Sequence, residues 1–263
     1  MVASVLKALR ILELFTPQMP ILTLNEITNR IGYPKSTVYS MLSTLATKGY
    51  VEKTDTNSYA LGRRFVSMTQ AVLVNVQLRD RAAPLLRQLG DSTEESVYLT
   101  VLDGNVSLYI YAIETSHRLL ARSAVGDEVP LHCTSVGKAI LAFLPPAEQE
   151  RIIEEVGLPR FTENTITEKS RLMDDLHITR ERGFSIDNEE HEAGSFCIGA
   201  PILNEKHEVA GSCSISGHNE SVIADKIEYY SSPVCYTAQE ISRRMGFVPS
   251  DMKQIWKHVT EPK

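Results

Sequence analysis

The 263-residue chain has only four cysteines, and none of them forms a Cys-x-x-Cys pair with another. Cysteines scattered in this way predict neither a disulfide framework nor a zinc site. No apolar run approaches the roughly 18 to 20 residues that cross a bilayer. The N-terminus also lacks the basic segment and apolar core of a signal peptide. We therefore expect a cytoplasmic protein with reduced thiols and no membrane partner.

The sequence also lacks the short motifs that carry catalysis. Gly194-Ser-Phe-Cys-Ile-Gly199 has neither the lysine nor the spacing of a phosphate-binding loop, and no nucleophile elbow or zinc-binding pattern is present. We therefore predict no catalytic residue, no metal and no cofactor. A thiol enzyme or redox sensor that uses Cys197, with His132 or His191 beside it, is the alternative.

Charge is distributed unevenly along the chain. Residues 1–80 contain nine basic and five acidic side chains, whereas the remainder contains 18 basic and 28 acidic ones, and the total is −6. A basic first segment on an acidic remainder predicts that only this segment meets a polyanion. The length of the chain suits two domains.

The basic segment has the pattern of a helix-turn-helix. Thr23-Leu-Asn-Glu26 has the form of a capping box, which predicts the start of a short second helix. Gly32 ends that helix, and a third helix follows from Pro34 to Gly49, because proline suits a first helical turn and glycine a left-handed stop. A first amphipathic helix over residues 5–15 would support both.

Two further patterns make this segment more specific. Strands over 50–53 and 59–61 around a polar turn predict a hairpin, the wing of a winged helix-turn-helix. The outward face of the third helix has no acidic side chain, so it can approach phosphates and base edges, although a tri-helical protein-interaction domain is an alternative. The residues that we predict to bind DNA are Lys35, Ser36, Thr37, Tyr39, Ser40 and Ser43.

A linker helix is predicted next. Phe65, Met68, Val72 and Val76 recur at helical spacing, and such a stripe needs a cover from the second domain or another subunit. A further helix over 79–89 would be kinked or restarted by Pro84.

The remainder of the chain mixes strands and helices as an α+β domain does. Strands over 97–102 and 106–113 form a hairpin around the turn Asp103-Gly-Asn105, and a third strand is expected over 118–123. Helices are predicted over 134–143, 146–156, 168–182 and 221–245, and strands over 184–187, 197–203 and 209–216. These strands form two sheet segments that bracket the helices.

Three of the strands carry candidate binding residues. Asp187 ends one strand and Cys197 begins the next, while Ser214 and Ser216 share one face of a third strand because residues two apart point the same way. Each has a plainer interpretation, since a buried cysteine is usually packing and an aspartate can cap a turn.

The helix after Thr134 supplies the other side of this site. Its first turn offers free backbone N–H groups and the positive end of the helix dipole, and Ser135 and Gly137 leave space for a ligand. His132 beside the helix start can be structural. Together with the strand residues, this turn predicts a pocket for a small organic anion.

Several motifs now occur in a recognisable order over nearly the whole chain. They are Pro34-Lys-Ser-Thr-Val38, Leu45 to Val51, Tyr59-Ala-Leu-Gly62, Pro130-Leu-His132, Gly137-Lys-Ala139, Arg182-Gly-Phe184, Asp187 to Glu190, Cys197-Ile198 with Pro201, and Ser214-Ile-Ser216. With these motifs the chain resembles the IclR family of bacterial transcription regulators.

The resemblance implies a winged helix-turn-helix head, a linker helix and a GAF-like α+β domain that binds an effector. It also implies a homodimer formed through the head and linker helix, often paired into a homotetramer through the second domain. The effector-binding residues that follow from the pattern and the resemblance are Ala121, Val129, Ser135, Val136, Gly137, Asp187, Cys197, Ser214 and Ser216.

The sequence departs from the family pattern in two places. Ser40 stands where many members have arginine, which predicts a different operator or one held more by phosphate contacts. Ser135 and Val136 are bulkier than the Gly-Ala pair of some relatives, which would reshape the pocket floor. The motifs most resemble the branch of 2-keto-3-deoxygluconate repressors, and aromatic-acid regulators share much of the pattern.

We thus expect a repressor of a catabolic operon that binds double-stranded operator DNA and responds to a keto, sugar or aromatic acid. The expected divisions are a DNA-binding domain at 1–62, a linker helix at 63–80, an effector-binding domain at 81–250 and a tail at 251–263.

Overall fold

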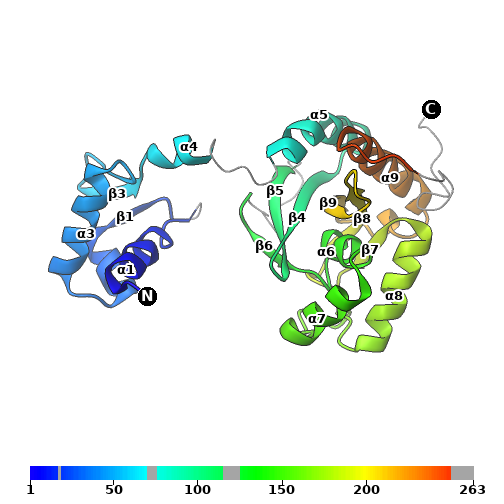
Figure 1. Ribbon diagram of the computed structural model, residues 1–263, viewed down its shortest axis with the longest axis horizontal. Coiled ribbons are helices and arrows are strands. Elements are labelled where there is room, and N and C mark those ends of the chain that lie inside the picture. The colour runs from blue at the N-terminus through cyan, green and yellow to red at the C-terminus, as the bar shows by residue number, and fades with distance from the viewer. Residues whose placement is uncertain (17–18, 70–75, 115–124, 250–263) are drawn as a thin grey trace. The chain divides into compact units, whose positions relative to one another are not determined.

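The computed structural model describes residues 1–263 except 17–18, 70–75, 115–124 and 250–263. The chain divides into two compact units, Met1–Val74 and Asn75–Lys263, which we call the head and the body (Figure 1). The predicted strand over 118–123 and the predicted tail lie outside the described residues. The finer domain boundaries stay predictions. Within the described part of the chain, no helix is long and apolar enough to cross a bilayer.

The head contains the predicted helices, α1 (Ala3–Leu12), α2 (Leu24–Ile31) and α3 (Lys35–Thr47). The capping box is confirmed: the Thr23 N–H donates to Glu26 Oε2 at 2.7 Å, and the Glu26 N–H donates to Thr23 Oγ1 at 3.3 Å. Gly32, in the left-handed conformation with φ +70°, ends α2 and opens the three-residue turn to α3.

The third helix ends as a Schellman motif. The N–H of Tyr50 donates to the carbonyl of Leu45, and that of Gly49 donates to the carbonyl of Ala46, both at 2.9 Å. Gly49 has a φ of +76°, which a residue with a side chain rarely adopts, so the predicted stop is confirmed.

A three-stranded sheet completes the head. The predicted wing strands are β2 (Val51–Lys53) and β3 (Ser58–Leu61), and β3 also pairs with β1 (Ile21–Thr23), which gives the order β1-β3-β2. The sequence analysis missed β1 because three residues are too few for a periodic pattern. After the wing, α4 (Arg64–Thr69) begins the predicted linker, and Phe65 packs edge-on against Tyr50 with ring centroids 5.6 Å apart.

The body is built on one six-stranded sheet instead of two separate segments. Its strands are antiparallel in the order β6-β5-β4-β9-β8-β7. They are β4 (Ser96–Asp103), β5 (Val106–Ile113), β6 (Glu128–Pro130), β7 (Ser185–Asn188), β8 (Phe196–Leu203) and β9 (Val209–Gly217). The pairing of β4 with β9 joins segments more than a hundred residues apart, which no local pattern reveals.

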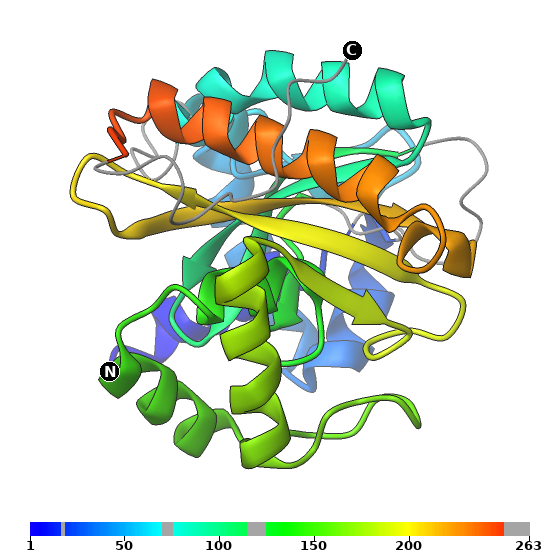
Figure 2. The same ribbon diagram turned by 90° about the vertical axis from the view of Figure 1, so that its right-hand side faces the viewer.

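Helices cover both faces of this sheet (Figure 2). One face carries α5 (Val76–Thr93) and α9 (Ile227–Arg244), and the other carries α6 (Ser135–Leu141), α7 (Pro146–Val156) and α8 (Lys169–Arg182), while a short 3₁₀ turn, η1 (Glu220–Val222), precedes α9. The expectation that a helix restarts at Pro84 is wrong, because α5 runs through this residue.

The two faces of the sheet differ in chemistry because side chains alternate along each strand. Ile198, Ile215 and Leu99 belong to the apolar core under α5 and α9. On the opposite face, β9 presents Ser212, Ser214 and Ser216, and the neighbouring strands present small or polar residues at the paired positions. This second face can therefore offer hydrogen bonds to a ligand.

Helix α6 is buried along its whole length against the polar face of the sheet. A methyl group on Gly199 would lie 2.6 Å from the backbone oxygen of Ser135, so only glycine permits this approach. The hydroxyl of Ser185 donates to the Ser135 carbonyl at 2.5 Å, and that of Ser212 donates to the Val136 carbonyl at 2.9 Å.

We expect Gly199→Ala to lower the free energy of unfolding by about 1–3 kcal/mol, because the added methyl meets backbone that cannot rotate away. Gly90→Ala is the matched control: it lies in α5, where the new methyl would make an ordinary contact of 3.4 Å, and alanine favours a helix. Urea unfolding of both variants checks the prediction. Equal midpoints for the two would contradict it.

Candidate functional sites

The outward face of α3 is the candidate nucleic-acid interface of the head. Val38 and Leu42 are buried in the head core, and Met41 and Leu45 pack against it. The predicted DNA-binding residues Lys35, Ser36, Tyr39, Ser40 and Ser43 are exposed, and Thr37 is half-buried. No acidic residue occurs within α3, so this face can approach phosphate without repulsion.

The turn before α3 is held against α1 by a cation and a hydrogen bond. Lys7 Nζ lies 5.0 Å from the ring centroid of Tyr33, and Arg10 Nη1 donates to the Tyr33 hydroxyl at 3.3 Å. These contacts fix the angle between the turn and the supporting helix, and they place two cations beside the start of α3. Sequence analysis did not single out Tyr33, because its partners lie more than twenty residues away.

In the body, one row of paired residues crosses the polar face of the sheet. Asp187 on β7 is opposite Cys197 on β8, which is opposite Ser216 on β9. In the next row, Gly199 is opposite Ser214. All four predicted strand residues therefore lie on one face, and each is less than 10% exposed.

The start of α6 faces these residues. Thr134 caps the helix, since its hydroxyl accepts the N–H of Gly137 at 3.0 Å. The first N–H groups of a helix have no partner within it. Because Thr134 satisfies that of Gly137, the N–H groups of Ser135 and Val136 are the ones left for a ligand.

A cavity of about 60 Å³ lies between the first turn of α6 and the row of strand residues. It is lined by Tyr98, Tyr109, Thr134, Ser135, Val136, Asp187, His191, Glu192, Ser195, Cys197, Ser214 and Ser216. Six of the nine predicted effector-binding residues are thus brought together at one cavity.

The other three predicted residues do not line it. Val129 packs behind the wall in a cluster with Tyr98, Tyr109 and Val136. Gly137 faces the chain before the helix, where a methyl group would lie 2.5 Å from the Cα of Leu131. Ala121 lies outside the described residues.

Two tyrosines are the main wall residues that sequence analysis missed. Tyr98 on β4 and Tyr109 on β5 stack edge to face, with ring centroids 5.2 Å apart. Each is an aromatic residue with a polar tip in a strand rich in aliphatic residues, which was the available signal. The place of Tyr98 in the cavity wall depends on the pairing of β4 with β9, which sets Tyr98 opposite Ser214. The local sequence does not reveal this pairing.

The carboxyl group of Asp187 lies in an unusual electrostatic setting. Asp187 is 4% exposed, and its Oδ1 accepts a hydrogen bond from the N–H of Glu190 at 2.8 Å. Asp187 therefore also caps the turn that follows β7. Burial and then the negative charge of Glu190 raise the pKa of Asp187 to about 7, against the opposing effects of backbone N–H groups and Lys138. The role of a turn cap and a place in the cavity wall are therefore compatible.

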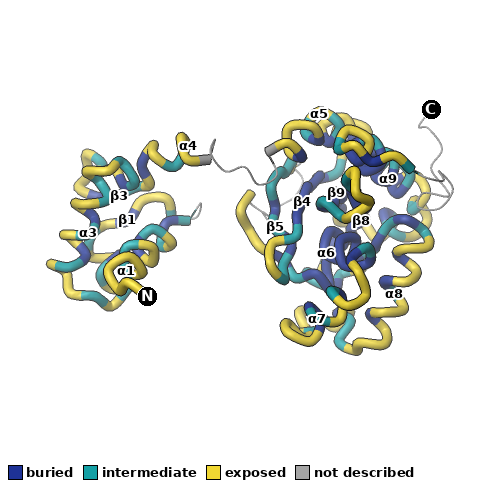
Figure 3. Tube along the Cα trace, in the orientation of Figure 1, coloured by how far each residue is buried: buried dark blue, intermediate teal, exposed yellow. Residues whose placement is uncertain are grey.

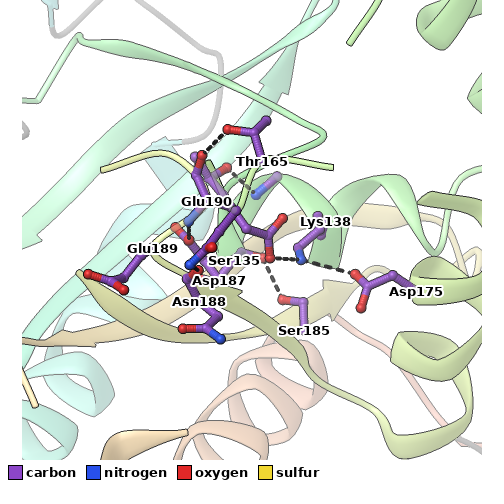
Figure 4. A network of polar contacts seen from close by, with 12 residues as sticks. Ser135, Lys138, Thr165, Asp175, Ser185, Asp187, Asn188, Glu189 and Glu190 are labelled. Carbon is purple, nitrogen blue, oxygen red and sulfur yellow. Dashed lines mark hydrogen bonds and ion pairs between the residues drawn. The ribbon is translucent and has the colours of Figure 1, made fainter. Parts of the chain in front are cut away.

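Beside the cavity, Lys138 forms a buried ion-pair network (Figure 4). Its ammonium lies 2.5 Å from Glu190 Oε1 and 3.0 Å from Asp175 Oδ2, and the residue is 1% exposed. Burial lowers the pKa of Lys138, but these two carboxylates more than offset that effect, so the pKa is raised and the ammonium stays charged. The network links α6, α8 and the turn after β7.

Polar side chains from a separate loop hold the backbone of that same turn. Thr162 Oγ1 donates to the carbonyl of Glu189, and Thr165 Oγ1 donates to the carbonyl of Glu190, both at 2.6 Å. Asn164 Nδ2 donates to the carbonyl of Asn188 at 3.1 Å. We call these three contacts the loop clamp. It fixes the main chain immediately before His191 and Glu192 of the cavity wall.

The cysteine and histidines of the alternative thiol site are placed as follows. Cys197 Sγ lies 3.0 Å from Ser216 Oγ, and His191 lines the same cavity. His132 Nε2 lies 3.0 Å from the carbonyl of Pro159. Among the described residues, no three His, Cys, Asp or Glu side chains are grouped to hold a metal.

Comparisons with known proteins follow the same division of the chain. Residues 4–55 match the IclR helix-turn-helix domain, and residues 70–243 match the C-terminal domain of the bacterial transcriptional regulator IclR. The chain is 32% identical over 247 residues to the transcriptional regulator XynR of Escherichia coli K12, with 94% of this chain and 98% of XynR covered. It is 33% identical to the regulator KdgR of the same organism, with 94% of each covered.

The fold also matches that of a solved relative. A crystal structure of an IclR homolog from Microbacterium hydrocarbonoxydans, complexed with 4-hydroxybenzoate, aligns with a TM-score of 0.83 at 21% identity. The alignment covers 92% of this chain and 99% of that one. At this identity, the likeness shows a shared fold only.

Replacement of Lys138 by methionine should cost about 3–5 kcal/mol of folding free energy, because it leaves buried carboxylates without a counter-ion. A second change, Glu190→Gln, should recover part of this loss. Arg151→Met is the control, since Arg151 pairs with Glu148 and Glu155 on the exposed surface of α7, where ion pairs contribute little. Denaturant unfolding measures all three, and equal losses from Lys138→Met and Arg151→Met would refute the argument.

Proposed function

Because the chain belongs to the IclR family of bacterial transcriptional regulators, we propose that it represses a catabolic operon and that a small organic acid controls this repression. The chain is a DNA-binding transcriptional regulator, and its family assigns it to regulators and not to thiol enzymes. The observation that carries the effector part is the cavity where Asp187, Cys197 and Ser216 face the start of α6.

The chemistry of the cavity supports an acid as the effector. Backbone N–H groups at Ser135 and Val136 can bind a carboxylate, while the hydroxyls of Ser214 and Ser216 suit the carbonyl or hydroxyl groups of keto and sugar acids. The solved homolog with 4-hydroxybenzoate contains an acid of the aromatic class. A cavity of about 60 Å³ fits a short keto acid directly, because one water-sized site takes ~10–15 Å³. A sugar acid or aromatic acid would require the wall to move outward.

On the DNA, α3 lies in the major groove of an operator half-site. Lys35 contacts a phosphate, and the hydroxyl-bearing face of Ser36, Thr37, Tyr39, Ser40 and Ser43 lies against phosphates and base edges. The wing turn at 54–58 lies along the backbone or minor groove. The operator is roughly palindromic because the protein binds it as a dimer.

The surface of the head supports this dimer. Val5 and Leu9 on α1 are 56% and 48% exposed, and Val2 immediately before the helix is 66% exposed, although their spacing is that of a buried stripe (Figure 3). In α4, Met68 is also exposed. A second copy of the chain is the proposed cover for these side chains, and the homo-oligomer is a dimer or a tetramer built from it. We place this regulator in the cytoplasm, where operator DNA is present.

For the effector to regulate DNA binding, it must bind one arrangement of the two heads better than another. The predicted linker over 63–80 carries this difference from body to head. The ligand's differential affinity for the two arrangements sets the largest change in operator affinity that it can cause.

Lys35→Ala should weaken operator binding several-fold and reduce the slope of log affinity against log salt by about 1, because one phosphate contact is lost. Lys206→Ala, at an exposed position in the body, is the charge-matched control and should change neither value. Electrophoretic or fluorescence titrations of operator DNA at several salt concentrations measure both. An unchanged salt slope for Lys35→Ala would remove this residue from the interface.

A thermal-shift screen against keto acids, sugar acids and hydroxybenzoates should identify the effector. At about 100 times its Kd, a ligand that binds only the folded body should raise the Tm by roughly 5–10 °C. Ser214→Ala should abolish this shift, whereas Ser231→Ala, a buried serine on α9 across the sheet, should keep it. No shift from any acid would contradict the proposed effector class.

A further inference from the structure

Among the residues that the structure describes, those that line the cavity of the body include carboxylates but no side chain with a fixed positive charge. Asp187 and Glu192 both line it, and no lysine or arginine is among these described residues. His191 is the one described lining group that could gain a positive charge, and burial lowers its pKa, which favours the neutral ring. The described part of the wall therefore offers an anion negative charge and no side-chain counter-ion.

The nearest buried cation does not change this balance. The Lys138 ammonium is already shared between Glu190 and Asp175, at 2.5 and 3.0 Å, so two carboxylates match its single charge. Among the described residues, the titratable and charged groups around Asp187 and Glu190 are Lys138 on α6, Asp175 and Arg182 on α8, Cys133 and His132 before α6, Tyr98 on β4, Tyr109 on β5, Cys197 on β8, and His191 and Glu192 after β7.

Like charges that share one buried site cannot both stay ionised, so one of them takes up a proton. Asp187 is the group that can hold it. The residue is 4% exposed, its Oδ1 accepts a backbone N–H, and Glu190 adds negative charge nearby. The carboxyl of Asp187 already titrates near neutral pH, with a pKa of about 7 caused first by burial. A ligand carboxylate placed beside it would raise that pKa further.

We propose that the effector binds as a monoanion together with one proton, and that this proton stays on Asp187, whose carboxyl group then donates a hydrogen bond to the ligand. The proposal rests on the proposed function, since it concerns the same cavity and an acidic effector. The only covalent bond that forms is the O–H bond of Asp187, and the proton comes from solvent whenever Asp187 is ionised in the free protein.

The sign of the pH dependence follows from this. Below the pKa of Asp187 in the free protein, the carboxyl is already protonated and affinity is constant. Above it, each binding event must take up a proton, so affinity falls as pH rises, toward tenfold per pH unit. A site that bound the anion through cations alone would keep its affinity over this range.

The test uses the full-length protein and three acids with one carboxylate each: pyruvate, gluconate and benzoate. Calorimetric titration from pH 6.0 to 8.5 gives Kd for each acid that binds. We expect Kd to rise about eightfold between pH 7.5 and 8.5. At each pH, repeating the titration in two non-phosphate buffers that work at that pH and differ in enthalpy of ionisation should show nearly one proton taken up per ligand at pH 8.5 and nearly none at pH 6.0.

Variants identify the group that holds the proton. Asp187→Asn keeps a hydrogen-bond donor without a titrating proton, so its Kd should become independent of pH. Glu192→Gln, in the same cavity wall, should keep the wild-type pH dependence, as should the surface control Asp174→Asn on α8. If Glu192→Gln removed the pH dependence instead, the assignment to Asp187 would be wrong.

The outcomes separate this inference from the function on which it rests. Binding of an acid with the same Kd at every pH, and with no proton uptake by the wild type, would overturn the inference and leave the effector site intact. Absence of binding by all three acids, even at pH 6.0, would overturn both. Because proton uptake is measured on the wild type, the test does not depend on the folding of any variant.

Discussion

One buried ammonium ties together the parts of the body that form its cavity. Lys138 lies on α6, one of its carboxylate partners lies on α8, and the other lies in the turn after β7. A buried charge is tolerated only with its partners in place. The positions of these three elements are therefore not independent. The shape of the cavity beside α6 and that turn depends on the ion pairs of Lys138, although Lys138 does not line the cavity.

The sheet has two separate functions, one on each face. The apolar side chains under α5 and α9 form the main core of the body, whereas serine, glycine, cysteine and aspartate follow each other across the opposite face. Because strand side chains alternate, a substitution on the face toward the cavity leaves the side chains of the main core unchanged. Two serines of this face also bind carbonyls of α6, so the polar row supports the helix as well as the cavity.

Features with a local cause were predictable from the sequence. The capping box at Thr23, the left-handed stop at Gly49 and the alternation of serines along β9 each depend on a few consecutive residues. Long-range features were not predictable in this way. The pairing of β4 with β9 brings Tyr98 to the cavity, and nothing near this tyrosine in the sequence indicates its partner.

Lys138 shows the same limit at one residue. In the sequence it stands in an ordinary helical stretch, where a lysine normally faces water. In the structure it is buried, because two carboxylates neutralise its charge. These carboxylates belong to residues 37 and 52 positions further along the chain, so the local sequence gives no sign of them. The exposed apolar side of α1 is the opposite case, since its periodicity predicts a buried stripe and the isolated chain leaves it uncovered.

The loop clamp has a consequence for how the binding preference of this fold can evolve. Its side chains donate hydrogen bonds to the backbone carbonyls of residues 188–190, and these carbonyls are present whatever side chains those positions carry. The adjoining side chains at 191 and 192 face the cavity from a main chain whose path is set by Thr162, Asn164 and Thr165. Mutation can therefore exchange these two side chains without rebuilding the wall, and a lineage can change the shape and charge of this cavity by small steps, each on an intact scaffold.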